Sequence, residues 1–600
     1  MSDTATEELA VVDPADNVLQ ALYQRAASKG SDTVLVTAEG DELTEMSADE
    51  VVSNVRALAA GLVGAGVKVG DRVALFSHAR TEWALLDYAI WQAGAVSVTI
   101  YETSSPDQVE WILQNSGATV ALVEDAERAS TVESVRSETP DLQSMFLIEG
   151  DGLAELKKLG ADVAGDELDQ RAATIDHAKP ATMVYTSGTT GRPKGCVLTH
   201  LNLIWTIRQV INTAPALVSP GNRTLTFLPL AHILARIVQL TAISGGVPVA
   251  FGGGIRTLLG DLALVRPTWL TVVPRVLEKV HDGAAQKAGT GVQRKIFDHA
   301  SDVARQVGAH KVAGTTPSVP LRLQHRVADA LVYRKLRAAM GGDLKYVISG
   351  GAPLHEDLAV FFNGIGVEVL EGYGLTETTG PATVDRPGHA KPGTVGPPLA
   401  GVDVRISELG EIQLKGNLVF QGYWQNNAAS AEAFDNGWFR TGDFGEIDED
   451  GHVVITGRMK DLIVTAGGKN IAPVPLETRV ASHRLVSHAV VVGDDRPFVA
   501  ALVTLDVQSL GSWASDNGRQ VGAPGQLVEE LADDPDLLQE VQAAVDVANE
   551  HVSRAEGIRT FRVLQADFTV ASGELTPTLK VRRSTVIANY SEVVEQIYER

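Results

Sequence analysis

The spacing of apolar residues alternates between two periods in the first third of the chain. Over residues 49–64 apolar side chains recur every three or four positions, which predicts a helix with one buried face. The runs 73–76, 96–101 and 119–123 are short and rich in apolar residues, as buried strands are, and a further predicted helix is capped by Thr81. Strands that alternate with helices in this way predict a largely parallel sheet covered by helices.

The pattern changes in the second half of the chain. Residues 279–335 are charged and rich in Ala, and their helical spacing is broken by Gly, Thr and Pro at 314–320. Residues 393–450 have the pattern of short strands joined by turns, and the acidic tetrapeptide 448–451 predicts a hairpin turn rather than a calcium loop. This part of the chain is therefore expected to add helices and a small β-rich unit.

A second domain is expected to begin near Lys460. Two strand-like runs come first, and residues 527–555 then keep a helical spacing despite Pro535. The predicted architecture is α/β, with domain 1–459 built from helix-covered sheets and a β-rich subdomain, and a smaller α+β domain over 460–600.

Charge and composition narrow the class of protein. The chain has 600 residues, with 51 Lys and Arg against 75 Asp and Glu, and a net charge of −24 at pH 7. This excess of negative charge argues against a nucleic acid partner and against electrostatic docking on anionic lipid. The acidic N-terminus lacks the apolar core of a signal peptide, and the uncharged stretch 237–255 contains Gly and Pro, so no transmembrane segment is expected. The single cysteine, Cys196, suits a reducing compartment, and a cytoplasmic location is expected.

The segment 185–195 indicates a loop that wraps a polyphosphate. It reads Tyr-Thr-Ser-Gly-Thr-Thr-Gly-Arg-Pro-Lys-Gly and follows a predicted buried strand, and strand ends are where α/β sheets bind ligands. Glycines let backbone N–H groups approach phosphate oxygens, hydroxyls add neutral donors, and lysine adds a mobile positive charge. The spacing differs from a Walker A motif. The residues expected to contact phosphates are Thr186, Ser187, Gly188, Thr189, Thr190, Gly191 and Lys194.

Two glycine-rich motifs further along predict a nucleotide platform and a metal ligand. The glycines of 349–353 and 371–377 let a flat base lie between the backbone and the ring of Tyr373. Thr376 can donate to a phosphate oxygen, and Glu377 offers the oxygen ligand that Mg²⁺ prefers. The residues expected around the nucleotide are Gly351, Ala352, Pro353, Tyr373, Gly374 and Thr376.

Together with the segments 228–234, 438–443, 457–461 and 573–583, these motifs resemble in order those of the adenylate-forming (AMP-binding) superfamily, and within it the long-chain fatty acyl-CoA synthetase group. The similarity extends over nearly the whole chain. It implies ATP-dependent activation of a long-chain fatty acid to an acyl-adenylate, followed by transfer to coenzyme A with release of AMP. ATP, Mg²⁺ and coenzyme A are the implied cofactors and co-substrates, and the C-terminal domain is implied to be mobile.

The same resemblance implies roles for single residues. His232 lies beside the reacting carboxylate, Lys580 bridges that carboxylate and the α-phosphate, and Lys460 is the hinge between the domains. Residues that complete the implied binding site are Asp443 and Arg458 at the ribose and Gly467 and Gly468 beside pantetheine. The implied catalytic set is Lys580, Glu377, Thr186 and His232, with Glu377 as the metal ligand.

Some alternatives stay open at this point. Arg192 in the phosphate loop and Ala235 before Arg236, where relatives often carry an acidic residue, depart from the group's pattern and leave acyl chain length undecided. A fatty acyl-AMP ligase serving a carrier protein, a luciferase and a catalytically silent nucleotide-binding protein share many of these motifs. A peptide-synthetase adenylation domain is disfavoured, because no aspartate precedes His232 in its motif. Peripheral contact with the inner face of a membrane and the oligomeric state also stay open.

Overall fold

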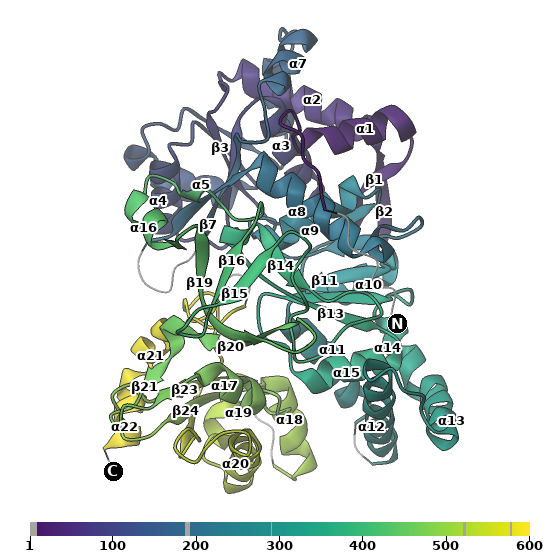
Figure 1. The fold of residues 1–600 in the computed structure, drawn as a ribbon, viewed down its shortest axis with the longest axis vertical. Coiled ribbons are helices and arrows are strands. Elements are labelled where there is room, and N and C mark those ends of the chain that lie inside the picture. Colours follow the sequence, from purple (N-terminus) through teal and green to yellow (C-terminus); the bar gives the residue numbers. More distant parts are fainter. Residues whose placement is uncertain (1–8, 187–191, 290, 520–523, 577–578, 600) are drawn as a thin grey trace.

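The computed structural model describes residues 9–186, 192–289, 291–519, 524–576 and 579–599. Its largest sheet has eight strands in the order β14-β13-β12-β11-β9-β10-β1-β2 (Figure 1). The neighbouring pairs are parallel except for the antiparallel edge strands β2 and β14. The strands are β1 (Thr33–Glu39), β2 (Glu42–Ser47), β9 (Thr224–Thr226), β10 (Val249–Phe251), β11 (Trp269–Val272), β12 (Tyr346–Gly350), β13 (Glu368–Leu375) and β14 (Gly380–Val384).

A second sheet of seven strands has the order β17-β8-β7-β4-β3-β5-β6. The strands from β7 to β6 run parallel, as the alternating pattern predicts, and β8 and β17 are antiparallel at one edge. The strands are β3 (Arg72–Phe76), β4 (Val96–Ile100), β5 (Val120–Val123), β6 (Ser144–Leu147), β7 (Pro180–Thr186), β8 (Lys194–Thr199) and β17 (Gly422–Tyr423).

Helices cover both sheets, and buried residues of α1, α2, α3, α8 and α9 share one continuous apolar core with the strands. The helices of this part are α1 (Leu19–Lys29), α2 (Ala48–Gly64), α3 (Thr81–Gln92), α4 (Pro106–Ser116), α5 (Ala126–Ser134), α6 (Gly152–Leu159), α7 (Gly165–Ala173), α8 (His200–Thr213), α9 (Ile233–Ser244), α10 (Leu258–Val265), α11 (Pro274–Lys287), α12 (Val292–Val312), α13 (Val319–Ala328), the π-helix η3 (Asp329–Tyr333), α14 (Arg334–Ala339), α15 (Glu356–Ile365) and α16 (Asn427–Glu432). The short 3₁₀ helices are η1 (Arg136–Glu138), η2 (Pro215–Val218), η4 (Thr376–Thr378) and η5 (Met459–Asp461).

An antiparallel five-stranded sheet forms the expected β-rich unit, with β15, β16, β19 and β18 in order and β20 paired to β19. Its strands are β15 (Asp403–Ile406), β16 (Glu411–Lys415), β18 (Phe434–Asp435), β19 (Trp438–Ile447) and β20 (Val453–Arg458). The turn between β19 and β20 is the hairpin predicted over 448–451, closed by the N–H of Gly451 to the carbonyl of Asp448 at 3.0 Å.

The C-terminal part has apolar clusters of its own. The large core ends at Val453, and the next two clusters draw on residues from Ile463 to Ile597. In Figure 1 these elements form the lower lobe beside α11 and α12. They are β21 (Ile463–Val464), β22 (Asn470–Ile471), α17 (Pro473–Ala481), β23 (Val486–Val492), β24 (Ala500–Leu505), α18 (Val507–Asp516), α19 (Pro524–Leu531), α20 (Pro535–Asn549), β25 (Phe561–Val563), α21 (Arg583–Asn589) and α22 (Ser591–Tyr598).

Two local predictions are wrong. Thr81 does not cap α3: it is the first helical residue, and its hydroxyl contacts that of Thr37 in β1 at 2.6 Å. The predicted helix over 527–555 is two helices, because Pro535 starts α20 and the Asp534 side chain caps it by accepting the N–H of Asp536. Proline is well suited to a first helical turn, where its missing N–H is not needed. Among the described residues, no helix is both long and apolar enough to cross a bilayer.

Candidate active site

A cavity of about 750 Å³ lies where the large sheet, the phosphate-loop hairpin, the β-rich unit and the C-terminal segment meet. Residues that are far apart in the sequence line it together. Of the residues predicted for the site, the lining includes Thr186, Lys194, His232, Gly351, Tyr373, Gly374, Thr376, Glu377, Arg458, Lys460 and Lys580. The fold therefore gathers most of the predicted residues at one place, while their individual roles stay predictions.

Several predicted residues do not line this cavity. Ala352 and Pro353 follow Gly351 but lie outside the lining, and Asp443 is buried behind Tyr373 and Arg458. Gly467 and Gly468 form the turn between β21 and β22, away from the cavity. The predicted loop residues Ser187, Gly188, Thr189, Thr190 and Gly191 lie outside the described residues.

Lys580 reaches the cavity from a tight turn near the C-terminus. The N–H of Thr576 donates to the carbonyl of Lys580 at 2.8 Å, and the N–H of Lys580 donates to the Thr576 hydroxyl at 2.9 Å. Leu579 takes a left-handed φ of 61°, so the backbone turns sharply just before the lysine. A Cβ added to Gly351 would lie 3.7 Å from Lys580 Nζ, which places the ammonium at the end of β12. Burial, together with repulsion from Arg458, lowers the pKa of Lys580 to about 8.

His232 caps the helix that borders the other side of the cavity. Its Nδ1 accepts the N–H of Leu234 at 3.2 Å at the start of α9. Burial, with repulsion from Lys580, lowers the pKa of His232 to about 3. The imidazole is therefore neutral at physiological pH, and because Nδ1 is the acceptor its proton is assigned to Nε2.

Asp443 and Arg458 form a pair directly across β19 and β20. Arg458 Nε donates to Asp443 Oδ1 at 2.6 Å, and the Tyr373 hydroxyl donates to Oδ2 at 2.6 Å. Both carboxylate oxygens of Asp443 thus have hydrogen-bond partners, and one partner is Tyr373, the ring predicted to stack on the nucleotide base. Burial alone would lower the pKa of Arg458, but the hydrogen bond and charge of Asp443 raise it, so the guanidinium stays charged.

Glu377 has an environment that fits Mg²⁺. The Tyr423 hydroxyl donates to Glu377 Oε1 at 2.8 Å, and in the described part of the chain no cationic side chain forms an ion pair with this carboxylate. Lys194 Nζ lies 4.9 Å from the centroid of the Tyr423 ring. A carboxylate oriented by a neutral donor and left without a resident cation suits a hard divalent metal. Tyr423 was not predicted from the sequence.

The far end of the cavity is apolar. It is lined by side chains of α8, η2, α9 and β11, including Val210, Ile211, Leu217, Val218, Ile237, Val238 and Trp269. This end is suited to a hydrocarbon chain, while the opposite end carries the cationic and hydroxyl groups.

The helix α9 is anchored by a buried ion pair. Arg236 and Asp87 have no exposed side-chain surface, and Arg236 Nη2 lies 2.5 Å from Asp87 Oδ1. The guanidinium also donates to Thr182 and Ser97, and it lies 5.3 Å from the ring centroid of Trp83. Position 235, before Arg236, is Ala in this chain where relatives often carry an acidic residue. The acidic partner of Arg236 here is Asp87 of α3. This pair fixes the helix that carries His232.

Two buried carboxyl groups lie close together, Glu371 in β13 and Asp385 directly after β14. The N–H of Glu371 donates to Asp385 Oδ2 at 3.1 Å. Burial, with repulsion from Asp385, raises the pKa of Glu371 to about 8, and burial also raises the pKa of Asp385 to about 7. These groups hold protons at a pH where exposed carboxyls are ionised.

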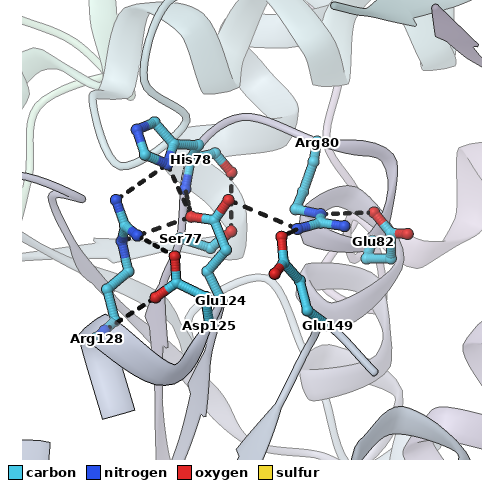
Figure 2. Close-up of polar contacts among 8 residues, drawn as sticks. All are labelled: Ser77, His78, Arg80, Glu82, Glu124, Asp125, Arg128 and Glu149. Carbon is cyan, nitrogen blue, oxygen red and sulfur yellow. Dashed lines mark hydrogen bonds and ion pairs between the residues drawn. The ribbon is translucent and has the colours of Figure 1, made fainter. Parts of the chain in front are cut away.

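A second polar cluster lies outside the cavity, where β3 and β5 end (Figure 2). Glu124 accepts from the backbone N–H of His78 at 2.9 Å and from its Nδ1 at 2.8 Å, and it lies 3.5 Å from nitrogens of Arg80 and Arg128. Burial alone would raise the pKa of Glu124, but the hydrogen bonds from His78 and the charges of His78 and Arg128 lower it to about 2. The cations are balanced by Glu124 and the neighbouring acids, so this cluster joins strand ends rather than offering an anion site.

A possible metal-binding group on the β19–β20 turn is already occupied by a lysine. Asp448, Asp450 and His452 offer ligand atoms close together, but Lys391 Nζ lies 2.7 Å from Asp448 Oδ2 and 2.6 Å from Asp450 Oδ2. The ammonium takes the position a metal would need. The turn is therefore structural, in agreement with the predicted hairpin.

Comparison with known proteins identifies relatives over almost the whole length. The AMP-binding enzyme family matches residues 22–424, and the AMP-binding enzyme C-terminal domain matches residues 460–600. The long-chain-fatty-acid–CoA ligase FadD15 of Mycobacterium bovis is 46% identical over 560 residues, 93% of each chain. The long-chain-fatty-acid–CoA ligase ACSBG2 of Xenopus laevis is 30% identical over 621 residues, which are 96% of this chain and 83% of the relative.

Solved structures share the fold. The anthranilate CoA ligase AuaEII in complex with anthranoyl-AMP superposes with a TM-score of 0.72 at 20% identity, over 97% of this chain and 99% of that chain. A Mycobacterium tuberculosis fatty acyl CoA synthetase superposes with a TM-score of 0.63 at 24% identity, over 96% and 99%. At these identities the likeness concerns the α/β architecture with its large and small parts.

Proposed function

The chain belongs to the AMP-binding enzyme family, and on that premise we propose that it activates a long-chain fatty acid with ATP and transfers the acyl group to coenzyme A. The products are acyl-CoA, AMP and pyrophosphate. The observation that carries the proposal is one cavity with an apolar end formed by α8 and α9 and a cationic end that contains Lys194 and Lys580. Such a cavity can align a fatty carboxylate with a triphosphate.

In the first half-reaction a carboxylate oxygen attacks the α-phosphorus in line and pyrophosphate leaves. Two anions must approach each other, and a buried ammonium at Lys580 lowers their repulsion. Thr186 and Lys194 border the phosphate end, and Glu377 would hold Mg²⁺, which when bound neutralises phosphate charge. The residues mainly position the reactants and stabilise charge, as phosphoryl chemistry requires.

The neutral state of His232 supports a place beside the fatty carboxylate. A charged imidazole would pair with that carboxylate and weaken its attack, whereas a neutral imidazole can contact it without neutralising it. The low pKa keeps this ring neutral across the physiological range. His232 is thus proposed to separate the reactive end from the apolar end formed by α9.

The nucleoside is proposed to lie along β13 and the β19–β20 pair. Gly351 and Gly374 border the space beside Tyr373 that is proposed for the base, and the ribose hydroxyls would approach Asp443. A Cβ at Gly374 would lie 1.8 Å from the carbonyl oxygen of Gly380, so glycine is needed there for the close approach of β14. Since the Tyr373 hydroxyl already bonds to the Asp443 carboxylate, ribose binding would replace or share this bond. Asp443 therefore links base and sugar recognition through one side chain.

For the second half-reaction we place a hinge at Lys460, between a domain 1–459 and a domain 460–600. The core divides between Val453 and Ile463, which supports separate bodies. In the orientation described, Arg275 of α11 donates to Ser487 of β23 and Gln286 of α11 donates to Ser509 of α18, each at 2.9 Å, and the rotation would break both hydrogen bonds. Rotation would withdraw Lys580 and bring Gly467 and Gly468 to the cavity, where the thiol of coenzyme A attacks the adenylate carbonyl and AMP leaves.

The activity would take place in the cytoplasm, with fatty acid drawn from the inner face of a membrane by peripheral contact. A fatty acyl-AMP ligase that serves a carrier protein is the main alternative, and it would form adenylate without consuming coenzyme A.

The test uses purified full-length protein with a ladder of fatty acids, ATP, Mg²⁺ and coenzyme A. Fatty-acid-dependent exchange of pyrophosphate into ATP reports the first step, and loss of free thiol reports the second. Exchange without thiol loss would favour the carrier-protein ligase, and the absence of exchange with every acid would refute the proposed chemistry.

A further inference from the structure

Helix α13 and the following η3 expose a row of apolar side chains. Val319, Leu323, Val327 and Leu331 recur every four residues and are exposed by 68%, 62%, 52% and 50%. Residues four apart lie on one face of a helix, so these four form a continuous stripe, which we call the α13 stripe. Exposed apolar residues scattered singly are ordinary, but an aligned row is not.

The orientation of this helix is fixed by its other face. Leu321 packs with Val303 and Val307 of α12, and the Tyr333 hydroxyl donates to the carbonyl of Ala300 at 2.6 Å. His325 Nε2 also contacts the carbonyl of Gly364 at 2.8 Å. The α13 stripe therefore faces away from the body, and in Figure 1 α13 lies at the outer edge of the molecule beyond α12.

A row of basic residues runs beside the stripe. Arg322 and Arg326 each precede a stripe residue, both are exposed, and in the described part of the chain neither guanidinium has an ion-pair or hydrogen-bond partner. Arg334 is 71% exposed on its side chain, and its Nε lies 3.0 Å from Asp329 Oδ2. The sequence from Val319 to Arg337 contains five Arg and Lys residues and one acidic residue, Asp329. This segment is therefore basic in a chain whose net charge is −24.

We propose that the α13 stripe and its arginine row dock on an anionic phospholipid surface. Helices that lie in the interface plane have this composition, with apolar side chains inserted at the headgroup level and arginines on phosphates. The remaining chain is strongly acidic, so an anionic surface would repel other faces and select this one. A second copy is a poorer partner, because pairing two stripes would bring two arginine rows together.

This inference gives the membrane contact proposed above a location, and it rests on the proposed function only for why such contact is useful. It also revises the expectation from net charge that electrostatic docking on anionic lipid is disfavoured. Net charge sums over all faces, whereas docking depends on the charge of the face that approaches.

The experiment measures co-sedimentation of the full-length protein with vesicles of phosphatidylcholine, with and without phosphatidylglycerol. The wild type should bind the anionic vesicles, and added salt should weaken binding. R322Q/R326Q should bind roughly 25-fold more weakly, at about fivefold for each arginine. L323S/V327S should bind at least about tenfold more weakly because less apolar surface is inserted. The matched control L409S, at a turn residue exposed by 77%, should bind like the wild type.

Two further readouts separate the possible failures. Acyl-CoA formation from a fatty acid supplied without vesicles should be equal in all variants, which checks the fold and the proposed activity independently of a lipid surface. Failure of the wild type to bind anionic vesicles, or unchanged binding of both double variants, would overturn the proposal. Self-association of the wild type in sedimentation velocity, lost in L323S/V327S, would show instead that a second copy covers the stripe.

Discussion

Replacing Lys580 with methionine tests the centre of the proposed chemistry. The pKa of Lys580 falls from 10.5 to about 8, which corresponds to about 3 kcal/mol for keeping its ammonium charged in the cavity. That unfavourable energy is relieved when a triphosphate and a carboxylate supply negative charge. Lys580→Met removes this attraction and should slow adenylate formation by roughly 100- to 1,000-fold, the usual effect of losing one preorganised charge donor.

The assay separates the two half-reactions. Fatty-acid-dependent pyrophosphate exchange reports adenylation, and thioester formation from supplied acyl-adenylate reports the second step. The second step should change by no more than a few fold, because in the proposed domain rotation Lys580 has left the cavity before it. In the wild type, kcat/KM for ATP in the exchange should fall as the pH rises through about 8, since this ratio reports the free enzyme and the lysine loses its proton there. Lys580→Arg should remove that fall, because the guanidinium stays charged.

Stability distinguishes a chemical defect from a folding defect. Below pH 8 the buried ammonium of Lys580 opposes folding, so Lys580→Met should have an equal or higher Tm. Lys415→Met, at an exposed lysine outside the cavity, is the matched control and should be neutral in both assays. Equal loss of both half-reactions by Lys580→Met, in a variant with normal Tm, would refute the idea that the lysine serves only the first step.

Three other changes probe the surroundings of the cavity. Tyr423→Phe removes the hydroxyl that orients Glu377, the proposed metal ligand, and should raise the Mg²⁺ concentration needed for half-maximal exchange by roughly tenfold; an unchanged Mg²⁺ titration would contradict this. Asp87→Asn leaves the Arg236 cation buried without its counter-charge and should cost about 3–5 kcal/mol in denaturant unfolding, whereas the matched surface change Asp169→Asn should cost less than about 1 kcal/mol; equal costs would be inconsistent with the buried pair. The pKa of Glu371 is about 8 in the folded state and near 4.5 in the unfolded state, so its contribution to folding stability is present at low pH and is lost as pH rises between these values. Glu371→Gln should therefore flatten the fall of Tm between pH 4.5 and 8, and parallel curves of Tm against pH for the two proteins would argue against this.

The parts of the site that could be predicted are those carried by contiguous motifs. A Gly-Thr-rich turn that follows a buried strand is consistent with phosphate binding, and the order of the motifs along the chain adds specificity to that prediction. Thr186 and Lys194 do border the cavity. The alternating pattern of apolar runs likewise predicts the parallel strands from β7 to β6 because each run reflects local geometry and burial. Local sequence also suffices for the hairpin at 448–451.

The parts that could not be predicted depend on partners distant in sequence. Arg236 and Asp87 are 149 positions apart, and only the folded chain shows that this cation has a buried partner. Tyr423 reaches Glu377 from a strand of the other sheet, so neither residue signals the contact. Thr81 has a good capping side chain, yet a hydroxyl of β1 competes for it, and tertiary contact prevails over local preference.

The charge of the cavity explains how an acidic protein can bind a triphosphate. Burial is the main cause of the lowered pKa of Lys580, and repulsion from Arg458 adds to it because Asp443, which is bonded to both Arg458 and Tyr373, offsets that repulsion only in part. The same ammonium contributes to the low pKa of His232. Both groups, Lys580 and His232, resist protonation in the free enzyme, and both would resist it less once phosphates arrive. Nucleotide binding should therefore be accompanied by net proton uptake between about pH 7 and 9, because Lys580 is partly deprotonated only in the free enzyme. Calorimetric titration with ATP in buffers of different ionisation enthalpy measures that uptake, and in Lys580→Met it should vanish while nucleotide still binds through β13 and Arg458.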